Sequence, residues 1–322
     1  MPSKDVILRM GRVGLTPLAV FVLLLAGLVA FGQDQSAPPA SGASPNAASL
    51  PDLKPDASGK LSQEQMQKLL RIVADKDLEN DKRLRDYTYI QREEEHKLDG
   101  KGQVKSTEVR TYEVMELYGE QVQRLIQKGD KALDGKDAAK EEEKIQKIID
   151  KRKNESEGDR RKREEKEEKD REEDRKFVRE IADAYNFKLV GTETLGGREA
   201  WVIEGEPRPG FVPQLKESKY LSKFHGRVWI DKNDLQLAKM DVECLDTVSW
   251  GLFLARFHKG SRFMLEQTRV NDEVWLPLHV VAKVDVRLAL LKNFDVNLEE
   301  TYRDYKKFRA TARIVDAGDV KP

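Results

Sequence analysis

Between residues 87 and 308, segments in which polar and apolar side chains alternate follow one another and are separated by short turns. Alternation with a period of two is typical of β-strands that have one buried face. The turns contain Gly, Asn and Asp, as in Gly196-Gly197 and Asn271-Asp272, and such turns favour hairpins. Because successive hairpins build an antiparallel sheet, the sequence predicts a mainly β domain.

The segment from Val274 to Leu288 is the most informative of these strands. Apolar residues occupy every second position, and Trp275, His279 and Lys283 lie between them. This pattern predicts one buried and one solvated face. The segment is also far longer than an ordinary strand of about 5–6 residues. Long strands joined by hairpins favour a strongly curved sheet or a barrel, so the contents of its concave side become the functional question.

Strand alternation assigns one set of aliphatic side chains to the concave side. Two interpretations of this set are open. In the first, these side chains form a closed core against helices at residues 61–82 and 177–185. In the second, they line a cavity for an acyl chain and the helices act as a lid, with a gain of roughly 25 cal/mol per Å² of acyl surface removed from water. The candidate residues are Val228, Ile230, Val242, Leu278, Val280, Val284 and Val286.

Two regions change from the period of a strand to that of a helix. Residues 61–82 have apolar side chains at helical spacing behind Ser62, a good capping residue. Residues 137–184 differ in kind, because the stretch from Arg152 to Lys176 contains no large apolar residue. Its Glu and Lys or Arg side chains form favourable pairs four residues apart. We interpret this region as an inserted, charged helical hairpin with a solvated tip around Asn154 to Asp159.

The N-terminus has the pattern of an export signal. Basic residues precede an apolar run from Leu15 to Phe31, and small residues follow. This predicts a cleaved signal peptide over residues 1–32, with an uncleaved membrane anchor as the alternative. We therefore expect an exported, periplasmic protein.

The remaining domain boundaries follow from composition. Residues 33–60 are rich in Ala, Pro, Ser and Gly, which predicts a disordered linker. The β domain is then expected to cover residues 61–316, with the charged helical insert at 137–184.

The sequence gives no support to several classes of function. The formal net charge is zero, so the whole chain offers no electrostatic attraction for nucleic acid. Cys244 is the only cysteine and is expected to be a buried, inert thiol. No motif of a nucleophile or a phosphate loop is present. We expect no enzymatic activity, no metal and no cofactor, because the four histidines are scattered: His96, His225, His258 and His279.

Four short motifs resemble a known family. They are Tyr87-Thr88-Tyr89, Gly197-Arg198-Glu199-Ala200-Trp201, Gly226-Arg227-Val228-Trp229-Ile230-Asp231, and Asn271-Asp272-Glu273-Val274-Trp275. Together with the preceding amphipathic helix, they resemble the LolA/LolB/RseB superfamily of proteins like the outer-membrane lipoprotein-sorting proteins. The resemblance implies an unclosed barrel of about eleven antiparallel strands, covered by helices and enclosing an apolar cavity for acyl chains.

The resemblance also implies a function. It points to a non-enzymatic, periplasmic carrier-like protein whose partners are lipid acyl chains or lipoproteins. The charged insert is not part of the standard carrier, and no cysteine lies near the cleavage site for lipid attachment. The alternative is an envelope sensor or interaction module that resembles RseB and recruits a protein partner through the insert.

Overall fold

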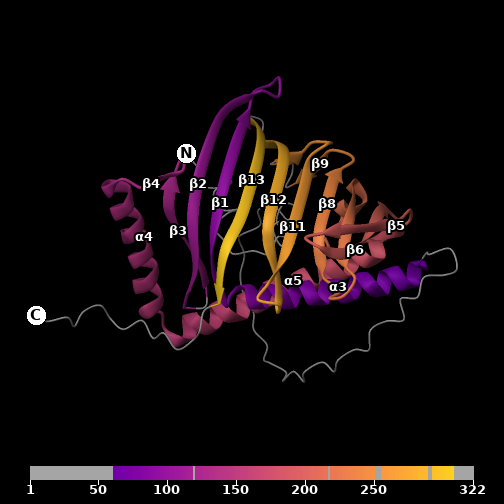
Figure 1. Cartoon of the computed structure of the whole chain (residues 1–322), viewed down its shortest axis with the longest axis horizontal. Helices are drawn as coiled ribbons and strands as arrows, with labels where there is room; N and C mark the ends of the chain where they lie inside the picture. Colours follow the sequence, from indigo (N-terminus) through magenta and orange to yellow (C-terminus); the bar gives the residue numbers. More distant parts are fainter. Residues whose placement is uncertain (1–60, 119, 217, 251–254, 289–291, 308–322) are drawn as a thin grey trace, which may run out of the picture.

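The computed structural model describes residues 61–118, 120–216, 218–250, 255–288 and 292–307. The signal peptide and linker predicted for the first 60 residues therefore lie outside the described residues. A broad sheet dominates the molecule, with helices α3 and α5 along one end of its strands and α4 beside one edge (Figure 1). In the described ranges, no helix is both long enough and apolar enough to cross a membrane.

The sheet is antiparallel throughout and follows the order β4-β3-β2-β1-β13-β12-β11-β8-β7-β6-β5, with β9 and β10 off this path. In the described chain no ladder joins the ends of this order, β4 and β5, so the curved sheet is unclosed. The prediction of a curved, open antiparallel sheet of about eleven strands is confirmed. The strands are β1 (Tyr87–Leu98), β2 (Val104–Leu117), β3 (Glu120–Lys128), β4 (Lys131–Ala132), β5 (Tyr185–Leu195), β6 (Arg198–Pro207), β7 (Phe224–Asp231), β8 (Leu237–Cys244), β9 (Val248–Trp250), β10 (Ala255–Phe257), β11 (Arg262–Val270), β12 (Val274–Leu288) and β13 (Lys292–Lys307).

Among the residues that the structure describes, three α-helices and one short 3-10 helix accompany the sheet: α3 (Gln63–Leu84), α4 (Gly135–Lys153), α5 (Glu157–Ala184) and η1 (Ser218–Lys223). Helix α3 begins with a capping box, in which Ser62 accepts a hydrogen bond from the Gln65 N–H and the Gln65 side chain bonds back to the Ser62 backbone. The charged insert consists of α4 and α5, joined by a turn at residues 154–156. The expected helical hairpin is wrong, because α4 follows one edge of the sheet and α5 runs at a steep angle to it instead of folding back along it (Figure 1).

Side chains from the helices cover both edges of the sheet. At the β5 edge, the Gln63 amide donates to the Phe187 carbonyl and accepts from the Phe187 N–H. At the β3 edge, Glu141 accepts from the Leu125 N–H at 2.9 Å. Lys144 donates to the Gln123 carbonyl at 3.1 Å. An exposed edge is a template for unwanted strand pairing, and these contacts satisfy part of its backbone.

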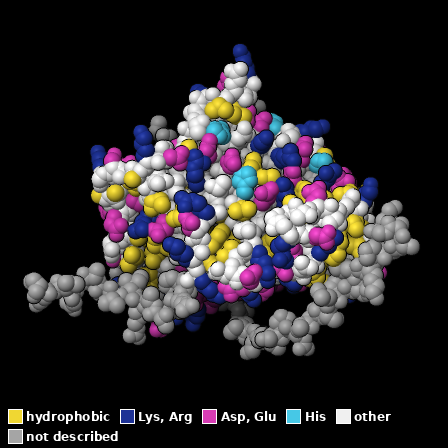
Figure 2. Space-filling view, in the orientation of Figure 1, with side chains coloured by type: hydrophobic (Ala, Val, Ile, Leu, Met, Phe, Trp, Pro, Cys, Tyr) yellow, Lys and Arg dark blue, Asp and Glu magenta, His cyan; other side chains and the backbone are white. Residues whose placement is uncertain are grey.

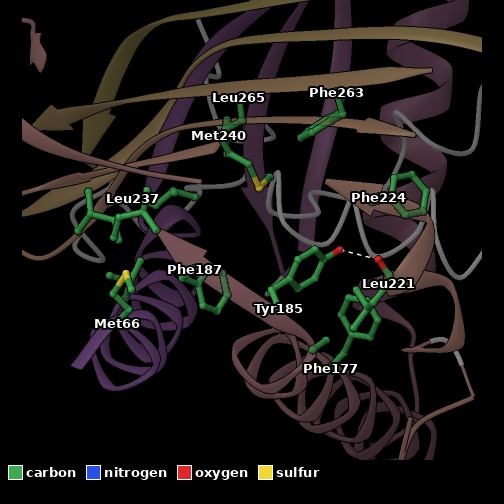
Figure 3. Packing of buried hydrophobic residues seen from close by; sticks show 14 of the residues in the cluster. Met66, Phe177, Tyr185, Phe187, Leu221, Phe224, Leu237, Met240, Phe263 and Leu265 are labelled. Atoms are coloured by element: carbon green, nitrogen blue, oxygen red, sulfur yellow. Dashed lines mark hydrogen bonds between the residues drawn. The ribbon is translucent and has the colours of Figure 1, made fainter. Parts of the chain in front are cut away.

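The main hydrophobic core lies between the sheet and the helices α3 and α5. Met66, Leu69 and Val73 of α3 and Phe177 of α5 pack against apolar side chains from β5, β7, β8, β11 and β12. Figure 3 shows these side chains converging from helices and strands, with the Tyr185 hydroxyl donating to the Leu221 carbonyl at 2.7 Å. The expectation of a buried cysteine also holds: Cys244 is 0% exposed, and burial raises the pKa of its thiol.

The uninterrupted alternation expected for β12 is wrong. Pro277 pairs with Gln267 and His279 with Glu266, which leaves Leu278 without a partner in β11. This β-bulge adds one residue and shifts the faces of the strand. Trp275, expected on the solvated face, is 5% exposed, whereas Leu278, expected on the buried face, is 43% exposed. Period alone cannot locate such a bulge, since both residues are large and apolar.

Two further strand predictions need correction. A single strand was expected over residues 235–249, but β8 ends at Cys244 and β9 begins at Val248. The Asp246 carbonyl accepts from the Cys244 thiol at 2.9 Å, and the Asp246 carboxylate accepts from the Thr247 N–H. These local bonds compete with the ladder and interrupt the strand. The short strand β10 was not expected.

Gly226 on β7 provides a direct test of strand spacing. A Cβ at this position would lie 2.5 Å from the Asp241 carbonyl oxygen of the neighbouring strand. We expect Gly226→Ala to destabilise the protein by about 1–3 kcal/mol, because the strands must separate to accept the methyl group. Urea denaturation measures the change. The control is Gly191→Ala, where the added Cβ meets nothing within 4 Å; equal stability of the two variants would contradict this account.

Candidate ligand-binding face

One face of the sheet carries an apolar row that packs toward α3, and we call it the inner face. Along this row, residues lie directly opposite one another from β6 to β12: Ile203, Val228, Met240, Leu265 and Val280. Side chains of directly opposed residues project to the same side of a sheet. All five belong to the main core or pack against it.

The inner face brings together most of the side chains expected at a ligand site. Ile230 and Val280 are buried at 0% and 4% exposure. Val228, Val242 and Val284 are partly buried against the same cluster. Their assignment to a ligand site stays a prediction.

The remaining two candidates fall elsewhere. Leu278, displaced by the bulge, is exposed and stands apart from the other five. Val286 pairs with Phe257 and Phe294 in the ladder, and its side chain lies outside the described part of the structure.

Where the row continues from β12 into β13, its side chains change from apolar to polar. Val280 is opposite Glu300, Glu300 is opposite Glu93, and Glu93 is opposite Arg110. Glu300 is 9% exposed. The Arg110 guanidinium binds Glu93 at 2.8 Å, and both side chains are largely buried. An apolar strip therefore ends in a polar patch, which we define as Gln91, Glu93, Arg110, Glu300 and Tyr302.

Burial governs the electrostatics of the polar patch. It raises the pKa of Glu300 to about 7, against an ordinary value of 4.5. Hydrogen bonds from Tyr302 and Gln91 act in the opposite direction, because they favour the charged carboxylate. Burial also raises the pKa of Glu93, although Arg110 opposes that change. Like charges directly opposite each other are destabilising, and Glu300, whose pKa is raised to about 7, lies directly opposite Glu93, which contacts Arg110.

Sequence reasoning missed the polar patch. The run Gln91-Arg92-Glu93-Glu94-Glu95 is polar at every position, so it shows no alternation and gives no sign of a buried face. The patch exists because the register of β1 against β13 places Glu93 opposite Glu300. A single sequence does not specify the register between strands that lie 200 residues apart.

The outer face carries ion pairs between strands. Lys239 binds Glu266 at 2.7 Å and lies over the Trp229 ring. His279 contacts Glu299 at 2.9 Å. On the face seen in Figure 2, basic and acidic side chains are interspersed. This mixed surface is that of a solvated sheet face.

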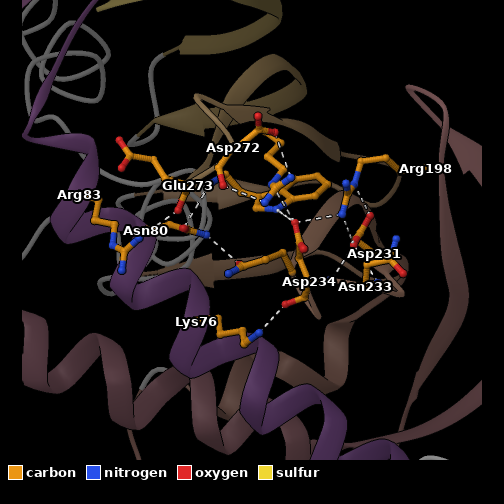
Figure 4. Close-up of polar contacts among 12 residues, drawn as sticks. Lys76, Asn80, Arg83, Arg198, Asp231, Asn233, Asp234, Asp272 and Glu273 are labelled. Carbon is orange, nitrogen blue, oxygen red and sulfur yellow. Dashed lines mark hydrogen bonds and ion pairs between the residues drawn. The ribbon is translucent and has the colours of Figure 1, made fainter. Parts of the chain in front are cut away.

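The motifs behind the family resemblance meet in space, at the turns beside α3 (Figure 4). Arg198 binds Asp231 through two hydrogen bonds of 2.7 and 2.8 Å. Asp234 accepts from the Trp275 indole at 3.0 Å, and the Arg198 guanidinium lies 5.5 Å from the Trp275 ring. Asn80 of α3 accepts from the Trp275 backbone N–H. The network joins three hairpin turns to α3, so these motifs serve the fold rather than chemistry.

Within the described residues, no group of three or more His, Cys, Asp or Glu side chains is arranged to hold a metal ion. What the inner face offers chemically is a combination of apolar surface and buried hydrogen-bonding groups. That combination suits an amphiphilic molecule, with its apolar body along β7 to β12 and its polar end toward Glu300.

The titration of Glu300 can be tested through stability. A carboxyl whose pKa is higher in the folded than in the unfolded protein favours folding below pH 4.5, and this contribution is lost as the pH rises through 7. Between pH 5 and pH 8, ionisation of Glu300 should cost the parent protein up to about 3 kcal/mol of its free energy of unfolding. Because Gln does not ionise, we expect the Glu300→Gln variant to lose less stability over this pH range by that amount. Urea denaturation of both proteins at the two pH values measures this difference.

Asp77, whose pKa burial raises to about 6, titrates in both proteins and cancels in the comparison. Parallel pH dependence of the parent and the Glu300→Gln variant would show that Glu300 is not protonated near neutrality in the folded protein.

No protein-family model matches the sequence, and no curated protein is similar to it. Solved structures are similar at 10–11% identity. A domain from Vibrio parahaemolyticus described as an outer membrane lipoprotein-sorting protein covers 78% of this chain and 95% of its own, with a TM-score of 0.31. A LolA superfamily protein from Nitrosomonas europaea covers 76% and 93%, with a TM-score of 0.27. The MucA/MucB complex from Pseudomonas aeruginosa covers 76% and 99%, with a TM-score of 0.21. Similarity at this level says nothing about function.

Proposed function

We propose that the protein is a non-enzymatic, exported binding protein that holds an acyl chain, free or attached to a lipoprotein, against the inner face of its open sheet. The observation that carries this proposal is the partial burial of Val228, Val242 and Val284 beside the fully packed core. These side chains pack against the core and leave part of the apolar surface of the inner face exposed. The export signal expected in the first 32 residues supports a place in the periplasm.

The size of the apolar effect is sufficient for such binding. Each methylene group removed from water contributes about 0.8 kcal/mol. Eight such groups would contribute about 6 kcal/mol before the cost of restricting the ligand is subtracted. A net binding free energy somewhat below this value corresponds to reversible binding, as a carrier requires.

The polar patch supports an amphiphilic rather than a purely apolar ligand. Its carboxyl and hydroxyl groups lie in line with the apolar row, since Glu300 is directly opposite Val280. Each group already has a partner within the patch, such as Arg110 for Glu93. This arrangement supplies hydrogen bonds for a polar head group and does not present an activated nucleophile beside a base, which is why we propose binding rather than catalysis.

A second candidate function is recruitment of a protein partner through α5. The favouring observation is that none of the described side chains between residues 157 and 176 is buried. We expect that reversing the charge of the exposed Lys162, Lys166 and Lys169 abolishes binding of a protein partner that recognises α5 by charge, and leaves the affinity for an acyl chain unchanged. Loss of acyl binding in that variant would argue against a separate partner surface.

The proposal is tested with a matched pair of variants on one strand. Val284→Gln places a polar group on the inner face, and Leu278→Gln changes an exposed residue of β12. We expect Val284→Gln to weaken binding of a fluorescent fatty acid about fivefold, which corresponds to about 1 kcal/mol of lost apolar burial. Leu278→Gln should bind like the parent protein. Urea denaturation verifies that both variants are folded.

Two results would contradict the proposal. One is the absence of any saturable fatty acid binding by the parent protein. The other is an identical affinity of all three proteins, which would place the fatty acid somewhere other than the inner face.

A further inference from the structure

The chain path itself links the two ends of the sheet. Strands β4 and β5 stand at opposite ends of the strand order but are consecutive in the sequence. The consecutive helices α4 and α5 are the connection between them, and α5 continues directly into β5 at Tyr185. In Figure 1, α4 lies along the β3 edge and α5 runs across the width of the sheet toward β5.

The first end of this connection is fixed to the β3 edge. Ile145 of α4 is buried with Leu117 and Val122 of the sheet. Lys128, at the end of β3, binds Asp137 of α4 at 2.5 Å. Together with the backbone contacts of Glu141 and Lys144, these interactions hold α4 against the edge.

The second end is fixed to the core near β5. Phe177 is 3% exposed and belongs to the main hydrophobic cluster. Arg71 of α3 binds Asp183 at 2.6 Å, and Asp75 of α3 binds Arg179 at 3.0 Å. The Glu180 carboxylate accepts from the Ser218 hydroxyl at 2.6 Å, which fixes the loop beside β5 and β7.

Between these ends, none of the described side chains of α5 at residues 157–176 is buried. Ion pairs one turn apart support it, including Arg160–Glu164, Arg161–Glu165 and Glu172–Lys176. The turn before it is locked by Glu155, which binds both Arg152 and Arg163. A helix that is polar on all sides and carries many such pairs is typical of a bridge through solvent.

The length of α5 matches the width of the sheet. A helix of 28 residues is about 42 Å long. From β3 to β5 there are nine interstrand spacings, or about 43 Å along the sheet. A fully helical α5 is therefore about as long as the path along the sheet from β3 to β5, whereas an extended chain of the same 28 residues could span about twice that distance.

We propose that α5 is a strut that holds the two edges of the open sheet at a fixed separation and so sets the width of the opening to the inner face. Antiparallel sheets twist, and with enough strands they curl toward closure. A helix fixed at both ends resists that movement, because bending it would break its backbone hydrogen bonds. The strut is a property of the fold and does not depend on which molecule the inner face binds.

The separation can be measured in the full-length chain by electron–electron resonance between two spin labels. Lys131→Cys on β4 and Thr192→Cys on β5 place the labels at exposed positions on the two edges. Cys244 is fully buried and stays unlabelled, as a sample without introduced cysteines verifies. In the protein with an unchanged α5, we expect one narrow distribution of the distance between the two labels.

Two variants then change the strut. Deleting residues 165–171 removes close to two turns, so both ends keep their orientation while the helix shortens by about 10 Å; the label distance should fall by about 5–10 Å. Lys166→Gly with Lys169→Gly softens the helix and should broaden the distribution about twofold. The matched control, Lys166→Ala with Lys169→Ala, should keep the parent distribution.

Unchanged distributions in both the deletion and the glycine variant would overturn the proposal, because the edges would then hold their separation without the helix. If the deletion variant does not fold, the glycine and alanine pair decides the question. Failure of fatty acid binding would leave these distances unaffected, so the two proposals fail separately.

Discussion

In the part of the chain that the structure describes, the sheet has two edges that do not pair with each other, and the helices are arranged around these edges. An antiparallel sheet that closes into a barrel satisfies its edge strands by pairing them, but here β4 and β5 end the order without meeting. Side chains from helices satisfy some of the backbone groups of β5 and of β3, the neighbour of β4. Gln63 pairs with both backbone groups of Phe187, while Glu141 and Lys144 bond to β3. The helices are therefore part of the sheet's stability as well as its cover.

Keeping the sheet open has consequences for its inner face. Part of that face packs with α3 and α5 into an ordinary core, as the burial of Ile203 and Leu265 indicates. Another part, at Val242 and Val284, is only partly covered. Next to this apolar surface lies the polar patch around Glu300. In the binding function that we propose, these buried groups orient the polar head of the ligand.

The sequence predicted the class of fold well and the details of its faces less well. Alternation and turn residues located β2, β7 and β12 closely, and the capping residue Ser62 marked the start of α3. The bulge at Leu278 could not be seen, because the residues around it are apolar on both faces. The polar patch was hidden for the opposite reason: β1 is polar on both faces near Glu93, and only the register with β13 buries one of them. The alternation of side chains predicts the two faces of a single strand. The register, which decides which residues of two strands lie opposite each other, depends on both strands and is not specified by the alternation.

We propose that the inner face holds an acyl chain in the folded protein. Mass spectrometry can detect such a chain in protein that is exported to the periplasm, purified without detergent and extracted with organic solvent. We expect fatty acyl species in an amount close to one per protein molecule, reduced in the Val284→Gln variant and retained in the Leu278→Gln variant. Folded protein that is free of acyl species under the same conditions would overturn the proposal.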